Sequence, residues 1–212
     1  MQKMVVYTVF KTKWGYFGLA AADNGLLRTC LPAGEREKVK SQLLQNLPGS
    51  QYDKNLFKSA QEQITAYFEG ACINFRDIPV VLACPERPVV STVEPSRRAC
   101  PERPVVSEPV LSVVERAEPS RGDGLGLFTR RVLTACRSIE FGRTVSYGRL
   151  AEMAGKPGSA RAVGGVLAQN PLPLIIPCHR VICANGSLGG FSAMGGVRLK
   201  KRLLELEASN IA

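Results

Sequence analysis

Residues 83–121 constrain the fold most, because this segment repeats itself and carries half of the chain's 14 prolines without one aromatic residue. Two strings recur: ACPERPVVS at 83–91 and 99–107, and EPSRR at 94–98, which returns as EPSRG at 118–122. Proline at this density excludes helix and central strand, and a segment of this composition supplies no core. The sequence therefore predicts two folded domains, residues 1–82 and 122–212, separated by a disordered, mostly extended insertion.

The insertion has two possible roles. It is either a partner-binding arm or a repetitive segment that the fold tolerates, since a long exposed loop adds little closure entropy. We favour the second interpretation.

The N-terminal section has the pattern of a small α+β domain. Its first residues are short apolar stretches interrupted by Trp-Gly at 14–15 and by the strong turn signal Asp-Asn-Gly at 23–25, which predicts three antiparallel strands. Apolar residues at helical spacing then predict two helices, within 34–49 and 55–70, each ending in glycine. The run INFRDIPVVL at 73–82 predicts a further strand.

The C-terminal section begins with an amphipathic helix within 126–142 and continues as helix, Gly/Pro turn and helix over 144–171. Ser146 and Ser159 are the predicted N-caps of these two short helices, which makes the pair a helix-turn-helix candidate. The second helix carries small residues beside Arg161: Ala160, Ala162, Gly164 and Gly165. Small residues suit either close approach to a DNA groove or a crowded helix crossing, and this segment alone does not separate the two.

Charge and cysteine content limit the possible partners and the cellular compartment of the protein. The net charge of +10 is concentrated in residues 122–212, where 12 Lys and Arg stand against 5 Asp and Glu, which favours a polyanion partner over a basic surface without one. The seven cysteines form no CxxC pair, no apolar run is long enough for a membrane, and no signal peptide is visible. We expect a cytoplasmic protein with reduced thiols and no metal site.

The only histidine, His179, directly follows Cys178 in PLPLIIPCHRVICANG. A reactive cysteine needs a base or a cation that lowers its pKa, and His179 and Arg180 are the nearest candidates. Neighbours on a strand point to opposite faces, so a working pair requires a turn, which the nearby prolines favour and the Asn170 side chain is able to brace. The alternative is a buried structural cysteine beside a surface histidine.

The string IPCHRVI, with SARAVGGVLAQNP upstream and GGFS downstream, resembles the active-site region of the O6-alkylguanine-DNA alkyltransferases, also called methylated-DNA-protein-cysteine methyltransferases. The resemblance extends from about Phe128 to Glu207. It implies an α+β protein with a small ribonuclease-H-like N-terminal domain, which the first section resembles in element order, and a mostly helical C-terminal domain carrying a winged helix-turn-helix-like DNA-binding unit.

The resemblance also implies roles for residues. Cys178 matches the alkyl acceptor, His179 the base that acts on it through a water, and Glu207 the carboxylate that orients the histidine. Glu205 is an alternative to Glu207, because this chain carries about two extra residues between Ser192 and Leu203. Asn170 matches the asparagine that braces the turn, and Tyr147 the tyrosine beside the flipped base.

For DNA, the resemblance assigns Arg161 to the gap that a flipped nucleotide leaves, within a contact helix. That helix is expected to contact DNA through Ser159, Ala160, Ala162 and Gly164, while Ser192 and Phe191 belong to the substrate pocket. Ala168 departs from relatives that carry arginine there, which alters phosphate contact or substrate range. Zinc-binding residues of some relatives have no counterpart here.

The chemistry explains these residue types. A methyl group on guanine O6 is a poor electrophile, so a thiolate is the best side-chain nucleophile, and the base must be flipped out of the stack to reach it. The product thioether has no labile bond. We therefore expect repair of O6-alkylguanine in double-stranded DNA by a monomer without cofactor, one turnover per molecule. The alternatives are a non-catalytic alkylated-DNA-binding protein, a cysteine hydrolase and a transcription regulator.

Overall fold

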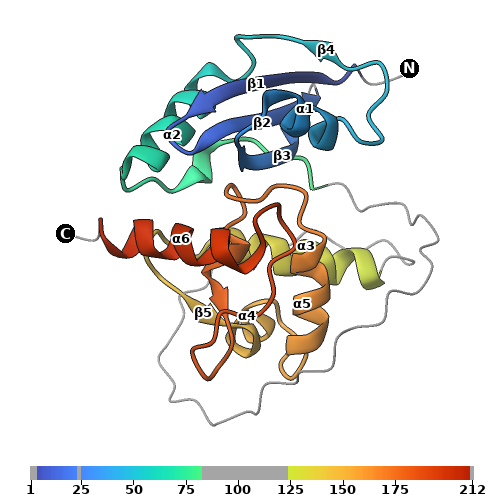
Figure 1. The fold of residues 1–212 in the computed structure, drawn as a ribbon. Helices are drawn as coiled ribbons and strands as arrows, with labels where there is room; N and C mark the ends of the chain where they lie inside the picture. Colours follow the sequence, from blue (N-terminus) through green and yellow to red (C-terminus); the bar gives the residue numbers. More distant parts are fainter. Residues whose placement is uncertain (1–3, 23–24, 83–123, 211–212) are drawn as a thin grey trace.

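The computed structural model describes residues 4–22, 25–82 and 124–210. The chain forms two domains, an N-terminal sheet with helices and a mostly helical C-terminal domain (Figure 1). The α+β fold class is confirmed. The predicted insertion at 83–121 and the domain boundaries on either side of it lie outside the described residues, so they stay predictions.

The N-terminal sheet has the strand order β3-β2-β1-β4. Its strands are β1 (Val6–Thr12), β2 (Gly15–Ala22), β3 (Gly25–Ala33) and β4 (Gln51–Tyr52). The three predicted antiparallel strands are confirmed as β1 to β3, and β4 adds a short parallel edge to β1. Gly15 begins β2 at a φ of 128°, and a Cβ there would lie 2.5 Å from the Ala33 carbonyl oxygen, so only glycine fits this turn.

The two faces of the sheet have different partners, as strand alternation requires. One face, with Tyr7, Val9, Ala20 and Cys30, packs under α1 (Arg36–Leu43). The other, with Phe17, Leu19 and Ala21, packs against α2 (Lys58–Glu69) and joins a core that continues into the C-terminal domain. Helices therefore pack on both faces of the sheet, while its edge strand β4 is exposed.

The helix predictions for this domain hold in position and differ in length. The first helix ends at Leu43, before the expected glycine, and the chain turns three residues later at Asn46, which is in the left-handed region with φ 62°. The second ends at the predicted glycine, Gly70, with φ 108°.

The predicted strand at 73–82 is wrong. Residues Phe75–Asp77 form a short 3-10 helix, η1, and the segment then makes one bridge, from Val80 to Leu26. Pro79 has no N–H to donate to a ladder, so only its carbonyl, which accepts from the Leu26 N–H at 2.9 Å, contributes beside that bridge.

The C-terminal domain contains α3 (Gly124–Arg137), β5 (Val145–Ser146), α4 (Tyr147–Met153), α5 (Ala160–Ala168), the 3-10 helix η2 (Cys178–Arg180), β6 (Val181–Ile182) and α6 (Gly196–Ala208). Helices α4 and α5 form the predicted helix-turn-helix. Ser146 caps α4 by accepting from the Arg149 N–H at 3.1 Å. Ser159 is the N-cap residue of α5, as predicted, but with ψ 26° its side chain makes no capping hydrogen bond.

The two domains contact each other beside Cys178. The Thr29 N–H of β3 donates to the Pro171 carbonyl at 2.9 Å, and the Thr29 hydroxyl donates to the Pro173 carbonyl at 2.7 Å. The N-terminal sheet thus holds the loop that leads into the cysteine. No helix within the described ranges has the length and apolar character needed to cross a lipid bilayer.

Candidate active site

The chain bends sharply before Cys178, as a neighbouring cysteine and histidine require. The Asn170 side chain accepts from the Leu172 N–H at 3.0 Å and donates to the Ile176 carbonyl at 2.9 Å, which closes the loop. Leu174 inside it has a φ of 77°. Cys178 then begins η2, so the predicted turn is present and Asn170 lies where a brace is needed.

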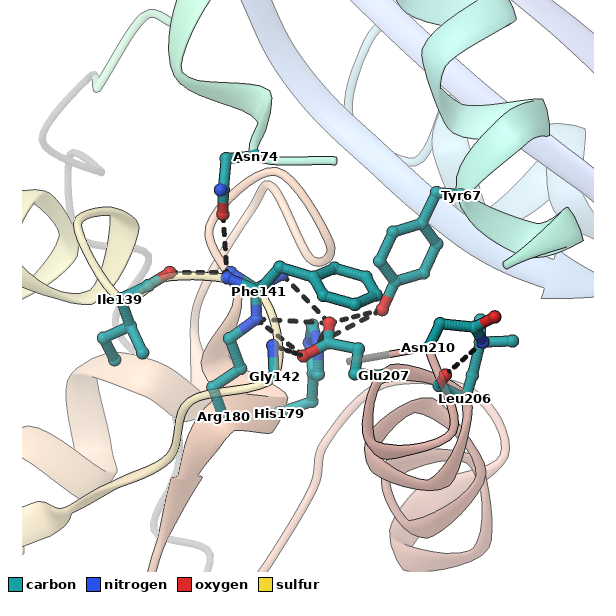
Figure 2. Close-up of polar contacts among 10 residues, drawn as sticks. All are labelled: Tyr67, Asn74, Ile139, Phe141, Gly142, His179, Arg180, Leu206, Glu207 and Asn210. Carbon is teal, nitrogen blue, oxygen red and sulfur yellow. Dashed lines mark hydrogen bonds and ion pairs between the residues drawn. The ribbon is translucent and has the colours of Figure 1, made fainter. Parts of the chain in front are cut away.

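His179 is fully buried, with its Nε2 2.9 Å from Oε1 of Glu207 (Figure 2). A carboxylate only accepts, so Nε2 carries the proton and Nδ1 holds the lone pair. Burial lowers the pKa of His179, and this outweighs the hydrogen bond and charge of Glu207, which raise it. The imidazole is therefore neutral at pH 7. Its Nδ1 is buried and has no hydrogen-bond partner among the described residues.

Glu207 of α6 is the carboxylate that reaches the histidine. Burial raises its pKa, but the hydrogen bonds and charges of His179 and Arg180 outweigh burial and hold the pKa at about 2. The alternative, Glu205, is on the exposed side of α6 and pairs with Lys201 at 3.6 Å. The structure thus brings Glu207, and not Glu205, to the site.

Arg180 is committed to this carboxylate. Its Nε lies 3.0 Å from Oε2 and a terminal nitrogen lies 2.9 Å from Oε1, while its other terminal nitrogen donates to the Ile139 carbonyl at 2.6 Å. Arg180, one of the two candidates for a group that lowers the pKa of the thiol, does not serve it, because its guanidinium is paired with Glu207.

Cys178 is a thiol in the resting protein. Burial raises its pKa, while a hydrogen bond with the Asn170 side chain and the charge of Lys200 lower it by less. Lys200 of α6 is the buried cation here: its Nζ donates to the Val181 carbonyl at 2.6 Å and lies 5.8 Å from the centre of the Tyr147 ring.

Cys178 is 7% exposed, and it lines a cleft of about 320 Å³ between the two domains. The C-terminal wall holds Asn170, Pro173 and the loop residues Ser192, Ala193 and Met194; the N-terminal wall holds Arg28, Thr29, Gln42 and Asn46. Ser192 donates to the Ala168 carbonyl at 2.8 Å, which ties this loop to the end of α5. Phe191 packs against the core and does not belong to the lining.

The predicted DNA-contact residues lie on or just before α5. Arg161 and Ala162 are exposed, and Ser159, Ala160 and Gly164 are half-buried. A Cβ on Gly164 would lie 4.0 Å from the Tyr147 ring, so α5 passes close to that tyrosine. Tyr147 begins α4 and also packs beside Gly189.

Sequence reasoning missed two site residues. Tyr67 of α2 donates to Oε1 of Glu207 at 2.6 Å, and nothing in the apolar pattern of α2 distinguishes this ring from a core side chain. Lys200 did leave a signal, because Lys200, Leu203 and Glu207 share one helical face and two of the three are charged. Within the described ranges, no three His, Cys, Asp or Glu side chains gather to hold a metal ion.

Two family models match the chain. "6-O-methylguanine DNA methyltransferase, ribonuclease-like domain" matches residues 5–82, and "6-O-methylguanine DNA methyltransferase, DNA binding domain" matches residues 127–209. Together the two matches cover about three quarters of the sequence.

Curated relatives and solved structures agree with the family models. A methylated-DNA–protein-cysteine methyltransferase of Cricetulus griseus is 47% identical over 103 residues, covering 42% of this chain and 49% of that protein, so the chain spans about half of its length. A variant of the Mycobacterium tuberculosis O6-methylguanine methyltransferase has a TM-score of 0.65 at 29% identity, covering 99% of this chain and 96% of that one. The same organism's OGT in complex with DNA has a TM-score of 0.62 at 28% identity, covering 97% and 94%.

The two family models name the same family, and each matches the domain in which the structure shows the corresponding fold. The resemblance seen in the active-site string is thereby confirmed, and the chain belongs to the 6-O-methylguanine DNA methyltransferase family.

Proposed function

We propose that this protein repairs O6-alkylguanine in double-stranded DNA by moving the alkyl group onto Sγ of Cys178. One observation carries the proposal: a cysteine on the wall of an open cleft is followed by a fully buried histidine whose Nε2 is held by an ionised carboxylate. That is the arrangement of a nucleophile, a base and the group that orients the base.

The histidine acts as the base for the thiol. With Nε2–H on Glu207, the Nδ1 lone pair is the only basic atom of the ring, and it reaches Sγ through one bridging water. The resulting imidazolium is stabilised by Glu207. The thiol proton therefore leaves at the moment of reaction, which suits a cysteine whose resting pKa is raised by burial.

The transfer is a displacement at the alkyl carbon. Sγ forms the new C–S bond, the C–O6 bond breaks, and its electron pair remains on guanine. Tyr147 donates its phenol proton to the leaving base, and the proton taken from Cys178 returns to Tyr147, so the products are guanine and an S-alkyl cysteine. A thioether has no bond that water hydrolyses readily, so each molecule acts once.

Recognition rests on α5 and on charge. The small side chains of α5 allow its backbone to approach a groove, and Arg161, an exposed residue of this helix, fills the space that the flipped nucleotide leaves. The M. tuberculosis OGT structure with DNA and the excess of positive charge in residues 122–212 support a duplex partner. We further propose that the protein works in a reducing compartment such as the cytoplasm, because transfer needs a free thiol and all five cysteines within the described ranges are free. We also propose that it acts as a monomer.

The direct test is intact mass after incubation with a duplex that contains one O6-methylguanine, followed by peptide mapping. A gain of one methyl group on Cys178, absent from Cys178→Ala, is the expected result. Cys183→Ala is the matched control, since Cys183 is half-buried and outside the cleft lining, and it should still gain the methyl group. Binding of the lesion without any mass gain would instead support a non-catalytic alkylated-DNA-binding protein.

A further inference from the structure

Tyr67 lies outside the domain that supplies the other active-site side chains. It belongs to α2 of the N-terminal domain, whereas Cys178, His179 and Glu207 all lie between residues 124 and 210. Its side chain is fully buried, and its hydroxyl donates to Oε1 of Glu207 at 2.6 Å (Figure 2). A hydroxyl donating to an ionised carboxylate at this distance is a strong, charge-assisted hydrogen bond.

Three residues donate to one carboxylate oxygen. Oε1 of Glu207 accepts from Tyr67 at 2.6 Å, from His179 at 2.9 Å, and from two nitrogens of Arg180 at 2.9 and 3.2 Å. Oε2 accepts from Arg180 and, at 3.0 Å, from the Gly142 N–H. Arg180 and Gly142 therefore hold the carboxylate in place without Tyr67. The hydroxyl of Tyr67 instead competes with the imidazole for the electron density of Oε1.

The geometry assigns Tyr67 as a positioning residue that sets the base strength of His179 through Glu207, which makes the N-terminal domain part of the active site. This inference rests on the proposed alkyl transfer for its catalytic meaning.

The physical reason lies in the strength of the carboxylate as an acceptor. A strong donor on Oε1 withdraws negative charge, so Glu207 stabilises the imidazolium less and His179 stays neutral to lower pH. Burial, and then the charge of Glu207, raise the pKa of Tyr67, so the phenol remains a donor throughout the physiological range. Tyr67 thereby keeps the base ready in its unprotonated form.

The surroundings of Tyr67 make a clean variant available. Its ring packs against Phe68, Phe75 and Phe141 with centroid distances of 5.3, 5.6 and 5.8 Å. Tyr67→Phe keeps these contacts and removes only the hydroxyl. Tyr7→Phe is the matched control, because Tyr7 is also a buried tyrosine of the N-terminal domain but belongs to the other face of the sheet.

The single histidine of the chain makes the first measurement direct. With ¹⁵N-labelled histidine, the NMR spectrum contains one imidazole, so its tautomer and its pKa are read without assignment. Tyr67→Phe should raise the pKa of His179 by about half a unit or more, and Tyr7→Phe should leave it unchanged. An unchanged His179 titration in folded Tyr67→Phe would overturn the inference.

The second measurement follows the rate of methyl transfer from duplex DNA against pH. Because the neutral imidazole is the base, a higher pKa moves the acid limb of the profile to higher pH, and the rate on that limb falls about threefold for half a unit. The plateau at high pH should change little. A uniform loss at every pH, or none, would contradict the assigned role.

A double-mutant cycle separates this role from packing. If Tyr67 acts through Glu207, then Tyr67→Phe should have no further effect on the His179 titration in a Glu207→Gln background, whereas a packing defect would persist there.

If Tyr67→Phe does not fold, the wild-type protein provides the test of the contact. We expect a slowly exchanging Tyr67 hydroxyl proton with an NOE to the imidazole, and rapid exchange of this proton would refute the contact. If the wild-type chain transfers no methyl group, the proposed function is wrong. The His179 titration in Tyr67→Phe still tests whether Tyr67 sets the pKa of His179.

Discussion

Glu207 determines how charge is balanced at the site. Its carboxylate carries the only negative charge among the described site residues, and Arg180, His179, Tyr67 and the Gly142 N–H all donate to it. With Arg180 charged and His179 neutral, Glu207 and the groups that donate to it have no net charge, which avoids the large cost of leaving this carboxylate unpaired. Lys200, the other buried cation of the site, donates to the Val181 and Leu188 carbonyls instead. In the proposed mechanism the same carboxylate orients the base, so Glu207 is expected to matter for both stability and activity.

This balance predicts how stability depends on pH. His179 has a lowered pKa in the folded state, so stability is full above the ordinary value of 6.5 and is lost as the pH falls from 6.5 toward the lower folded-state pKa. The pKa of Glu207 falls from 4.5 to about 2, so its contribution, about 3 kcal/mol, is lost between those two values. Urea unfolding should therefore show stability declining from about pH 6.5 and more steeply below 4.5.

Glu205, two residues before Glu207 on the same helix, provides the control for a stability test of Glu207. At pH 7, Glu207→Gln should lower the free energy of unfolding by about 3 kcal/mol, because Arg180 is left buried without its partner, and the steep loss below pH 4.5 should disappear. Glu205→Gln removes one exposed carboxylate from the same helix and should change stability by less than about 1 kcal/mol. Equal effects of the two substitutions would show that Glu207 is not the buried counter-ion.

At the scale of elements, local sequence signals predicted most of what positions the site. Turn residues and apolar spacing gave the first three strands, the helix-turn-helix and the bend before Cys178, because these depend on neighbours in sequence. The prediction of a strand at 73–82 was wrong, because Pro79 has no N–H and so restricts backbone pairing with a neighbouring strand. The role of Tyr67 could not be predicted from sequence, because its hydrogen-bond partner, Glu207, is 140 residues away along the chain. The choice between Glu205 and Glu207 needed the rotation of α6, which sequence fixes only within a residue or two.

Helix α5 carries the prediction that separates DNA distortion from chemistry. Arg161→Ala should slow transfer from O6-methylguanine in duplex DNA by about tenfold or more, because the stack is no longer held open, and should leave the reaction with free O6-methylguanine base within about twofold. Quenched time courses on the two substrates measure both effects. Arg36→Ala, which removes the same charge from α1 in the other domain, is the control for net charge. Equal losses on duplex and free base would contradict a base-flipping role.

At the scale of the whole molecule, the two domains form one site. The cleft has walls from both, Thr29 fixes the loop before Cys178, and Tyr67 reaches Glu207. Arg137 of α3 adds further links by donating to the Phe75 carbonyl at 3.0 Å and to the Ile78 carbonyl. Contacts among the described residues therefore link the two domains directly.

This arrangement predicts that residues 84–120 are dispensable. The family models match 5–82 and 127–209, on either side of this segment, so neither match depends on it. Replacing 84–120 by a Gly/Ser linker of about half its length should change the free energy of unfolding by less than about 1 kcal/mol, since halving a loop alters its closure entropy by only about 0.6 kcal/mol. The rate of transfer from duplex DNA should stay within about twofold of the unmodified chain. Urea unfolding and transfer kinetics on the same preparation test both values. A large loss of transfer with unchanged stability would instead identify the repeat as an arm that contacts DNA or another partner, and a large loss of stability would show that it contributes to the fold.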